Sequence, residues 1–285
     1  MAEMNSLVET DWLETHLGDA DLRVYDCTTV YSSPDSQRMQ FDGGRSGYDE
    51  GHVPGAGFID VLGELSDGAS PLRTMMPPVE QFTAAMSNYG IGDGVRVVLY
   101  DNQLNMWATR VWWMLRAMGF DDAAVLNGGW YKWTKEGRAV STEQPAIPPA
   151  TFVAKLRPSL FVDKDMVHDA IGQNESQIVS ALTPEMHAGE GLDVVQRGHI
   201  TSSTCVGFNE IVDLETMAYL PLDELREKFD AAGATADKQV ITYCGTGIAA
   251  TSDAFAMHLL GRDNVAVYDG SLEEWSADPD LPMEI

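Results

Sequence analysis

The stretch YCGTGIAA, residues 243–250, places a cysteine before a glycine-rich turn, directly after a segment with the composition of a buried strand. Cys244 is followed by Gly-Thr-Gly, and small and apolar residues then predict a helix that begins near Ile248. Glycines leave backbone amides unshielded, and amides that converge beside a helix N-terminus bind anions. Such a place stabilises the thiolate, which is the nucleophilic form of cysteine. The stretch therefore predicts a nucleophile whose sulfur, or a second sulfur bonded to it as a persulfide, lies among loop amides.

The other cysteines, Cys27 and Cys205, have no comparable surroundings in the sequence. The total of three cysteines is odd and contains no CxxC pair, which argues against a disulfide framework and against a cysteine zinc site. No dinucleotide fingerprint follows a strand, and no group of residues has the spacing of metal ligands. We therefore expect no metal and no cofactor beyond sulfur held covalently on Cys244.

The chain is strongly acidic, with 44 Asp and Glu against 18 Lys and Arg and a net charge of −26. This charge repels phosphates, so we expect no nucleic acid partner. Apolar runs are too short to cross a bilayer, and the N-terminal stretch has acids where a signal peptide has bases. We expect a soluble, cytoplasmic protein without a membrane partner. An anionic substrate would need a local positive field at its site.

Two parts of the chain repeat one pattern. The strand-like segments VRVVLYD (95–101) and KQVITYC (238–244) are each followed by a helix-length apolar pattern and then by a related segment, DAAVLNGGWYKW (122–133) or NVAVYDGSLEEW (264–275). Corresponding residues keep a nearly constant separation: His52 and His199, Asp101 and Cys244, Trp133 and Trp275. The constant offset indicates an internal duplication.

The repeat sets the expected domain organisation. We expect an N-terminal domain over 1–140, an extended linker over 141–158 that includes the proline-rich STEQPAIPPATF, and a C-terminal domain over 159–285. Strands alternate with helices in each copy, which predicts an α/β fold with a parallel sheet covered by helices on both faces. Ligands of such sheets bind at the carboxyl ends of strands, where Cys244 stands.

These motifs together resemble tandem rhodanese-type sulfurtransferases, the family of thiosulfate and 3-mercaptopyruvate sulfurtransferases. The resemblance covers nearly the whole chain and rests on GHVPGAGFID, RVWWMLRAMGF, VLNGGWYKW, YCGTGIAA and VYDGSLEEW. It implies two rhodanese-like domains, of which only the C-terminal copy is catalytic. It also implies a six-residue loop from Cys244 to Ala249 whose cysteine carries sulfur as a persulfide. In the first copy Asp101 stands at the cysteine position, and we expect that copy to be structural.

The loop sequence separates the branches of the family. Thiosulfate-using members resemble Cys-Arg-Lys-Gly, and mercaptopyruvate-using members resemble Cys-Gly-Ser-Gly. The sequence CGTGIA is similar to the second, with Thr246 in the serine position, where its hydroxyl relays a proton or holds the substrate. We therefore expect Cys244 and Thr246 to be catalytic. The substrate is expected to contact the rest of the loop: Gly245, Gly247, Ile248 and Ala249.

The substrate clamp departs from the family pattern. Ser180 and Leu182 occupy the places of an Asp-x-Arg motif, Met186 replaces a second arginine, and Thr74 stands where mercaptopyruvate enzymes have a histidine. The candidates for replacement cationic groups are Arg197, His187 and Arg73.

The resulting hypothesis is a sulfurtransferase that moves a sulfane sulfur from 3-mercaptopyruvate or thiosulfate through Cys244 to a thiol or cyanide. The donor is a small anion, and mercaptopyruvate is the favoured one. A thiosulfate-preferring enzyme and a non-catalytic persulfide carrier remain as alternatives. A cysteine phosphatase is disfavoured, because its loop would end in an arginine and residues 244–261 contain none.

Overall fold

A computed structural model describes residues 4–32, 40–191 and 194–285. The chain divides into two compact units. The first unit consists of Met1–Ala69, Met76–Arg157 and Leu214–Ala218, and the second of Ser70–Met75, Pro158–Asp213 and Tyr219–Ile285. Each unit therefore includes one short segment whose neighbours in sequence belong to the other unit. This segment is Leu214–Ala218 in the first unit and Ser70–Met75 in the second.

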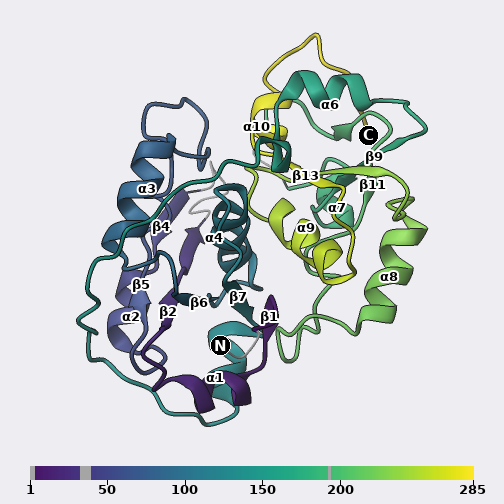
Figure 1. The fold of residues 1–285 in the computed structure, drawn as a ribbon. Helices are drawn as coiled ribbons and strands as arrows, with labels where there is room; N and C mark the ends of the chain where they lie inside the picture. The colour runs from purple at the N-terminus through teal and green to yellow at the C-terminus, as the bar shows by residue number, and fades with distance from the viewer. Residues whose placement is uncertain (1–3, 33–39, 192–193) are drawn as a thin grey trace. The chain divides into compact units, whose positions relative to one another are not determined.

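The first unit contains a five-stranded parallel sheet (Figure 1). The strand order is β1 (Leu7–Val8), β7 (Ala123–Leu126), β6 (Arg96–Tyr100), β2 (Leu22–Asp26) and β5 (Gly57–Phe58). Its helices are α1 (Thr10–His16), α2 (Arg45–Glu50), α3 (Val79–Asn88), α4 (Met106–Ala117) and α5 (Gly129–Lys135). A separate antiparallel pair joins β3 (Thr29–Ser32) to β4 (Gln40–Gly43).

The strand β6 is buried along its whole length. Both faces of this sheet are therefore covered by other side chains. Val98 and Tyr100 point to the face where Leu13 of α1 and Trp133 of α5 complete an apolar cluster. The alternate residues of β6 point to the other face, where α4 contacts β6 and β7. Strands buried on both faces read as continuous apolar runs, which is why VRVVLY shows no alternation.

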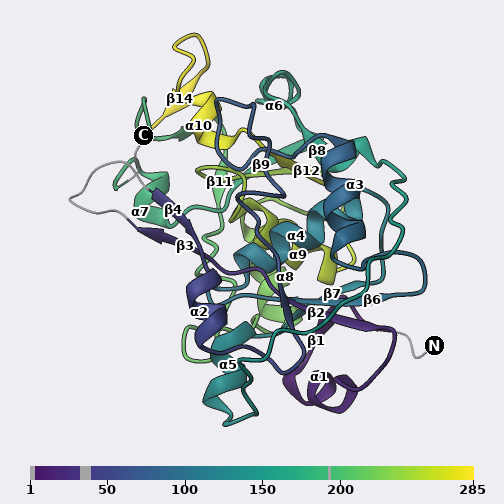
Figure 2. The same cartoon turned by 90° about the vertical axis from the view of Figure 1, so that its left-hand side faces the viewer.

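The second unit repeats the arrangement with the strand order β8 (Phe161–Val162), β13 (Val265–Tyr268), β12 (Gln239–Tyr243), β9 (Ser176–Ser180) and β11 (Thr204–Cys205). Its helices are α6 (Lys164–Ala170), α7 (Pro184–His187), α8 (Leu222–Ala231), α9 (Ala250–Leu259) and α10 (Ser271–Trp275), with a 3-10 turn at Pro158–Leu160. Figure 1 shows α9 beside this sheet, and α9 contacts β12 and β13. A second antiparallel pair joins β10 (His199–Ile200) to β14 (Met283–Glu284), which lies beside α10 in Figure 2.

The expected duplication and the α/β fold are confirmed, because both sheets place equivalent strands in one order. The predicted strands at 95–101 and 238–244 became β6 and β12, each one residue shorter at either end. The two antiparallel pairs were not predicted from the sequence. Their strands have at most four residues and carry too little periodicity to be recognised.

The proline-rich stretch over 141–157 is extended and packs on the first unit. The amides of Lys155 and Arg157 donate to the carbonyls of Met118 and Ala117, both at 2.7 Å. Phe152 is buried against Phe82. None of the helices in the described part of the chain is long and apolar enough to cross a membrane.

Candidate active site

Cys244 lies at the carboxyl end of β12, the middle strand of the second sheet. The chain turns over residues 244–249 and enters α9 at Ala250. The Cys244 residue is only 3 % exposed. The loop carbonyls point toward α10, since Cys244 O accepts from Leu272 N at 3.0 Å and Gly245 O accepts from Glu273 N at 2.9 Å. This arrangement holds the loop by its carbonyl groups and leaves its amides for other partners.

The loop amides are available to an anion. Among the residues that the structure describes, four loop amides donate no hydrogen bond: those of Gly245, Thr246, Ile248 and Ala249. Gly247 has φ +78°, and a Cβ there would lie 2.5 Å from the carbonyl oxygen of Asp269, so the turn requires glycine at this position. The loop therefore combines a nearly buried cysteine with amide donors that have no acceptor in the described part of the chain.

The first copy shows what the equivalent loop does with an anion. The Asp101 carboxylate accepts hydrogen bonds at 2.6 to 3.1 Å from four backbone amides, those of Gln103, Asn105, Trp107 and Ala108. Asp101 is 1 % exposed, and burial is the main cause that raises its pKa, while these hydrogen bonds lower it. The first loop is thus an anion cradle filled by the protein's own side chain.

Ser271 is a site residue that the sequence did not single out. Its Oγ accepts a hydrogen bond from Cys244 N at 3.1 Å and donates to Tyr268 O at 2.8 Å. Ser271 adopts φ +48°, a left-handed conformation that is uncommon for serine. The equivalent residue of the first copy, Gly129, has φ +51°. The sequence feature that could have identified Ser271 is a serine at a position where the first copy has a glycine.

Thr246 presents an unused hydroxyl beside the sulfur-bearing residue. Thr246 is 8 % exposed, and its side chain makes no hydrogen bond to the described residues. Its carbonyl lies 2.7 Å from Thr74 Oγ1, which also lies 2.8 Å from Arg73 O. Thr74 belongs to the segment Ser70–Met75 of the same unit. The residue in the usual histidine place therefore contacts the loop backbone.

Arg73 is engaged by a carboxylate. Its Nε lies 2.7 Å from Glu273 Oε1, and its amide donates to Glu273 Oε2 at 2.9 Å. Glu273 also donates its own amide to Gly245 O. Its carboxylate offsets the charge that Arg73 could offer to a substrate, so the pair connects Ser70–Met75 to the loop.

His187 and Arg197 differ in charge and exposure. His187 stacks on His199 with ring centroids 3.8 Å apart, and burial, assisted by His199, lowers the pKa of His187 to about 4. At neutral pH His187 is therefore an uncharged ring. Arg197 is exposed and forms no ion pair with the described residues. Of the three candidate cations, Arg197 alone has a charge that no described carboxylate offsets.

Apolar residues stand where the family pattern has arginines, and a carboxylate lies close to the loop, since a Cβ at Gly247 would be 3.0 Å from Asp269 Oδ1. Leu182 is 4 % exposed and Met186, in α7, is half-buried. Asp253, in the first turn of α9, is completely buried, and neither of its carboxyl oxygens has a partner in the described structure. Burial raises its pKa well above the usual value.

The other two thiols differ from Cys244 in their surroundings. Burial raises the pKa of Cys205 to about 12 and raises that of Cys27 well above its usual value. Cys205 donates to Leu182 O at 3.2 Å, and Cys27 is completely buried beside Asp26 and Asp101. All three cysteines are free.

A scan against family models matches the rhodanese-like domain at residues 9–136 and again at 163–278. The chain belongs to the rhodanese family. It is 34 % identical to thiosulfate/3-mercaptopyruvate sulfurtransferase 2 of Arabidopsis thaliana, over 97 % of this chain and 86 % of that protein. It is 32 % identical to 3-mercaptopyruvate sulfurtransferase of Escherichia coli K12, over 97 % of both chains. The crystal structure of SseA from Escherichia coli, a 3-mercaptopyruvate sulfotransferase, superposes with a TM-score of 0.82 at 30 % identity, covering 94 % of this chain and 99 % of that one.

Each rhodanese domain match contains one of the two loops, the Asp101 loop in the first and the Cys244 loop in the second. The two loops differ in what their amides bind: those of the first donate to a carboxylate, and four amides of the second donate to none of the described residues. The family match and the relatives confirm the tandem rhodanese fold expected from the motifs.

Proposed function

We propose that this rhodanese is a sulfurtransferase that carries sulfane sulfur on Cys244 and prefers 3-mercaptopyruvate as donor. Sulfur transfer itself follows from the family, since the relatives over nearly the full chain are named sulfurtransferases. The observation that supports Cys244 as the carrier is the set of unused loop amides around a nearly buried thiol. A persulfide is an anion, and these amides could solvate its outer sulfur as the amides of the first loop solvate Asp101.

The proposed reaction is a double displacement. The Cys244 thiolate attacks the donor sulfur and forms an S–S bond. The carbon–sulfur bond of 3-mercaptopyruvate breaks, and its electron pair leaves on carbon as the enolate of pyruvate, which then takes up a proton. An acceptor thiolate or cyanide next attacks the outer sulfur and releases the Cys244 thiolate. Thr246 supplies a hydroxyl that can donate to the enolate oxygen or to the transferred sulfur.

The donor preference is argued from charge. Thiosulfate is a compact dianion, and the loop has no cation to meet it, because Gly245 and Thr246 occupy the positions of the arginine and lysine of thiosulfate-using relatives. Charge-assisted hydrogen bonds contribute about 1.5–3 kcal/mol each, so losing two would weaken thiosulfate binding about a hundredfold or more. Mercaptopyruvate carries one carboxylate. We assign that carboxylate to Arg197, since Glu273 holds Arg73 and His187 is uncharged at neutral pH.

The test compares initial rates with 3-mercaptopyruvate and thiosulfate under the same conditions, with cyanide as acceptor. We expect a higher kcat/KM with 3-mercaptopyruvate. Incubation with this donor should add one sulfur atom to Cys244, seen in the intact mass and lost on treatment with dithiothreitol. Cys244→Ser should abolish both the mass increase and turnover, and Cys205→Ser is the matched control that should retain them. A Cys244→Ser variant with wild-type rates would contradict the assignment.

Two outcomes would favour the alternatives. Equal or better kinetics with thiosulfate would make the chain a thiosulfate-preferring member of the same family. Persulfide on Cys244 without turnover of either donor would favour a carrier that receives sulfur from another protein. A cytoplasmic location is part of the proposal, because a reducing compartment keeps Cys244 and an acceptor thiol reduced.

A further inference from the structure

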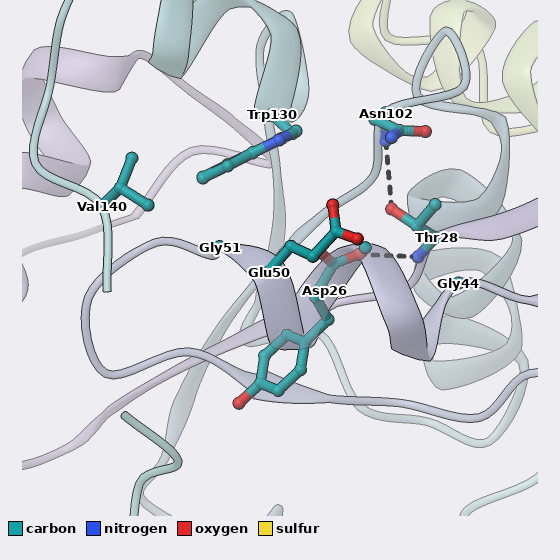
Figure 3. Close-up of a pocket in the computed structure, with 10 residues that line it drawn as sticks. Asp26, Thr28, Gly44, Glu50, Gly51, Asn102, Trp130 and Val140 are labelled. Carbon is teal, nitrogen blue, oxygen red and sulfur yellow. Dashed lines mark hydrogen bonds between the residues drawn. The ribbon is translucent and has the colours of Figure 1, made fainter. Parts of the chain in front are cut away.

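The first unit contains a cavity of about 340 Å3 that the sulfur chemistry of Cys244 does not use. Its lining is polar on one side and apolar on the other (Figure 3). The lining residues are Asp26, Thr28, Gly44, Gly47, Tyr48, Glu50, Gly51, Asn102, Trp130 and Val140. This volume is at the lower end of the range for ligand pockets, which fits a small molecule better than a peptide.

The cavity lies where α/β sheets bind ligands. Asp26 ends β2, and Asn102 follows β6 after Asp101, so the carboxyl ends of two neighbouring parallel strands meet there. The Asp101 carboxylate does not line the cavity, because it is turned into the backbone amides of its own loop. The first rhodanese domain thus has Asp101 in place of the cysteine. The cavity lies beside this position, which corresponds to that of Cys244 in the second domain.

The charged groups among the described lining residues are of one sign. These residues include the carboxylates of Asp26 and Glu50 and no lysine, arginine or histidine. Figure 3 shows the Glu50 carboxylate pointing into the space between Trp130 and Thr28, with Asp26 beside it. Asp26 is 4 % exposed and accepts from Thr28 N at 2.8 Å. Burial raises the pKa of Asp26 to about 6, so its ionised form at neutral pH would be stabilised by a nearby cation. This lining repels anionic sulfur donors.

The aromatic and apolar side of the cavity distinguishes an organic cation from a metal ion. Trp130 stacks on Tyr100 with ring centroids 6.2 Å apart and is itself partly exposed, and its indole N–H donates to none of the described residues. Val140 is 51 % exposed, and Gly51 lets it approach, because a Cβ at Gly51 would lie 2.9 Å from Val140 Cγ1. A magnesium ion prefers an octahedral shell of oxygens, which an indole and a valine cannot supply. An ammonium group with methyl or methylene substituents suits carboxylates together with an indole face.

We propose that this cavity binds a small organic ammonium ion, held between the carboxylates of Asp26 and Glu50 and the indole of Trp130. The bound cation offsets the negative charge of the two carboxylates that face the cavity. Its alkyl part packs on Trp130 and Val140. Because the cavity is lined by the first unit alone, the proposal is independent of the donor of Cys244. It gives the first domain a ligand-binding role in place of the lost sulfur chemistry.

The test is isothermal titration calorimetry of the full chain at low ionic strength with choline as the probe. The matched control ligand is 3,3-dimethylbutan-1-ol, which has the shape of choline without its charge. We expect one choline per chain and at least tenfold weaker binding of the neutral alcohol. Magnesium chloride at the same ionic strength should not compete.

Three variants localise the binding. Glu50→Gln, at an exposed position, should weaken choline about three- to tenfold, and Trp130→Leu should weaken it about two- to thirtyfold. Glu224→Gln, an exposed change in α8 of the second unit, is the charge-matched control and should leave binding unchanged. Equal binding of choline and the alcohol, competition by magnesium, unchanged binding by Glu50→Gln and Trp130→Leu, or no binding of choline would each overturn the proposal.

Discussion

The hydroxyl of Thr74 lies 2.7 Å from the carbonyl oxygen of Thr246, within the loop that bears Cys244. Thr74 is 5 % exposed and adopts φ +57°, a left-handed conformation that costs a β-branched residue energy. Neighbouring Arg73 holds Glu273, whose amide donates to Gly245 O. The segment Ser70–Met75 therefore contacts the loop at the carbonyl of Thr246 and, through Glu273, is linked to the carbonyl of Gly245.

Thr74→Val should lower kcat with the preferred donor about three- to tenfold, because a buried hydrogen bond to the loop contributes about 0.5–1.5 kcal/mol. Valine keeps the shape and the branched Cβ and removes only the hydroxyl. Thr74→Ser is the control and should retain most of the rate. Steady-state kinetics decide the matter, and a Thr74→Val enzyme as fast as Thr74→Ser would mean that the hydroxyl does not position the loop.

Gly245→Arg should raise kcat/KM for thiosulfate relative to 3-mercaptopyruvate about tenfold or more, because a charge-assisted contact contributes about 1.5–3 kcal/mol. A Cβ at Gly245 would meet no atom within 4 Å, so the side chain has room to begin there. Gly245→Gln, which adds length without charge, is the control. If the arginine and glutamine variants show the same donor ratio, charge does not set the preference.

Ser271→Ala should slow the alkylation and the sulfur loading of Cys244, because the Cys244 amide loses its hydrogen-bond acceptor, Ser271 Oγ. The variant should also lower the free energy of unfolding by about 1 kcal/mol. Ser271→Gly lacks the hydroxyl too but removes the cost of φ +48°, so it should be more stable than Ser271→Ala and equally slow. Wild-type loading in both variants would assign Ser271 a purely structural part.

Asp101→Ala should lower the free energy of unfolding by about 3 kcal/mol or more, because four amide donors lose their acceptor. Asp101→Asn keeps one acceptor oxygen and should lose less. Asp101→Cys should gain no donor-dependent sulfur in the intact mass, since the first loop lacks the glycine turn of the second. A persulfide on that engineered cysteine would show that the first copy lacks only its nucleophile.

The free energy of unfolding of the Asp26→Asn variant should increase relative to that of the wild type as the pH rises. Burial raises the folded-state pKa of Asp26 from 3.8 to about 6, so the folded protein binds a proton that the unfolded chain has released. Stability from this group is complete below about pH 4 and is lost as the pH rises toward 6, by about 3 kcal/mol in all. Urea unfolding of both proteins at pH 4.5 and 7.5 measures this; a difference that does not change with pH would contradict the linkage.

The position of Cys244 between a strand end and a glycine turn was predictable from the sequence, because its determinants are local. A strand of β-branched residues, a cysteine, a glycine turn and a helix follow one another without interruption, and the structure places them as β12, the loop and α9. The duplication was predictable for a related reason. Corresponding residues such as Asp101 and Cys244, or Trp133 and Trp275, occur at a nearly constant offset, and such an offset is a property of sequence alone.

The support of the loop was decided by tertiary structure. Thr74 and Thr246 are far apart in the chain, and Ser271 reaches Cys244 only because β12 and β13 are neighbours in the sheet. The same holds for the candidate cations: Arg73, His187 and Arg197 read alike in the sequence as basic groups near motifs. Glu273 offsets the charge of Arg73, and burial beside His199 keeps His187 uncharged at neutral pH. Such pairings depend on distance and burial, which no local sequence pattern records.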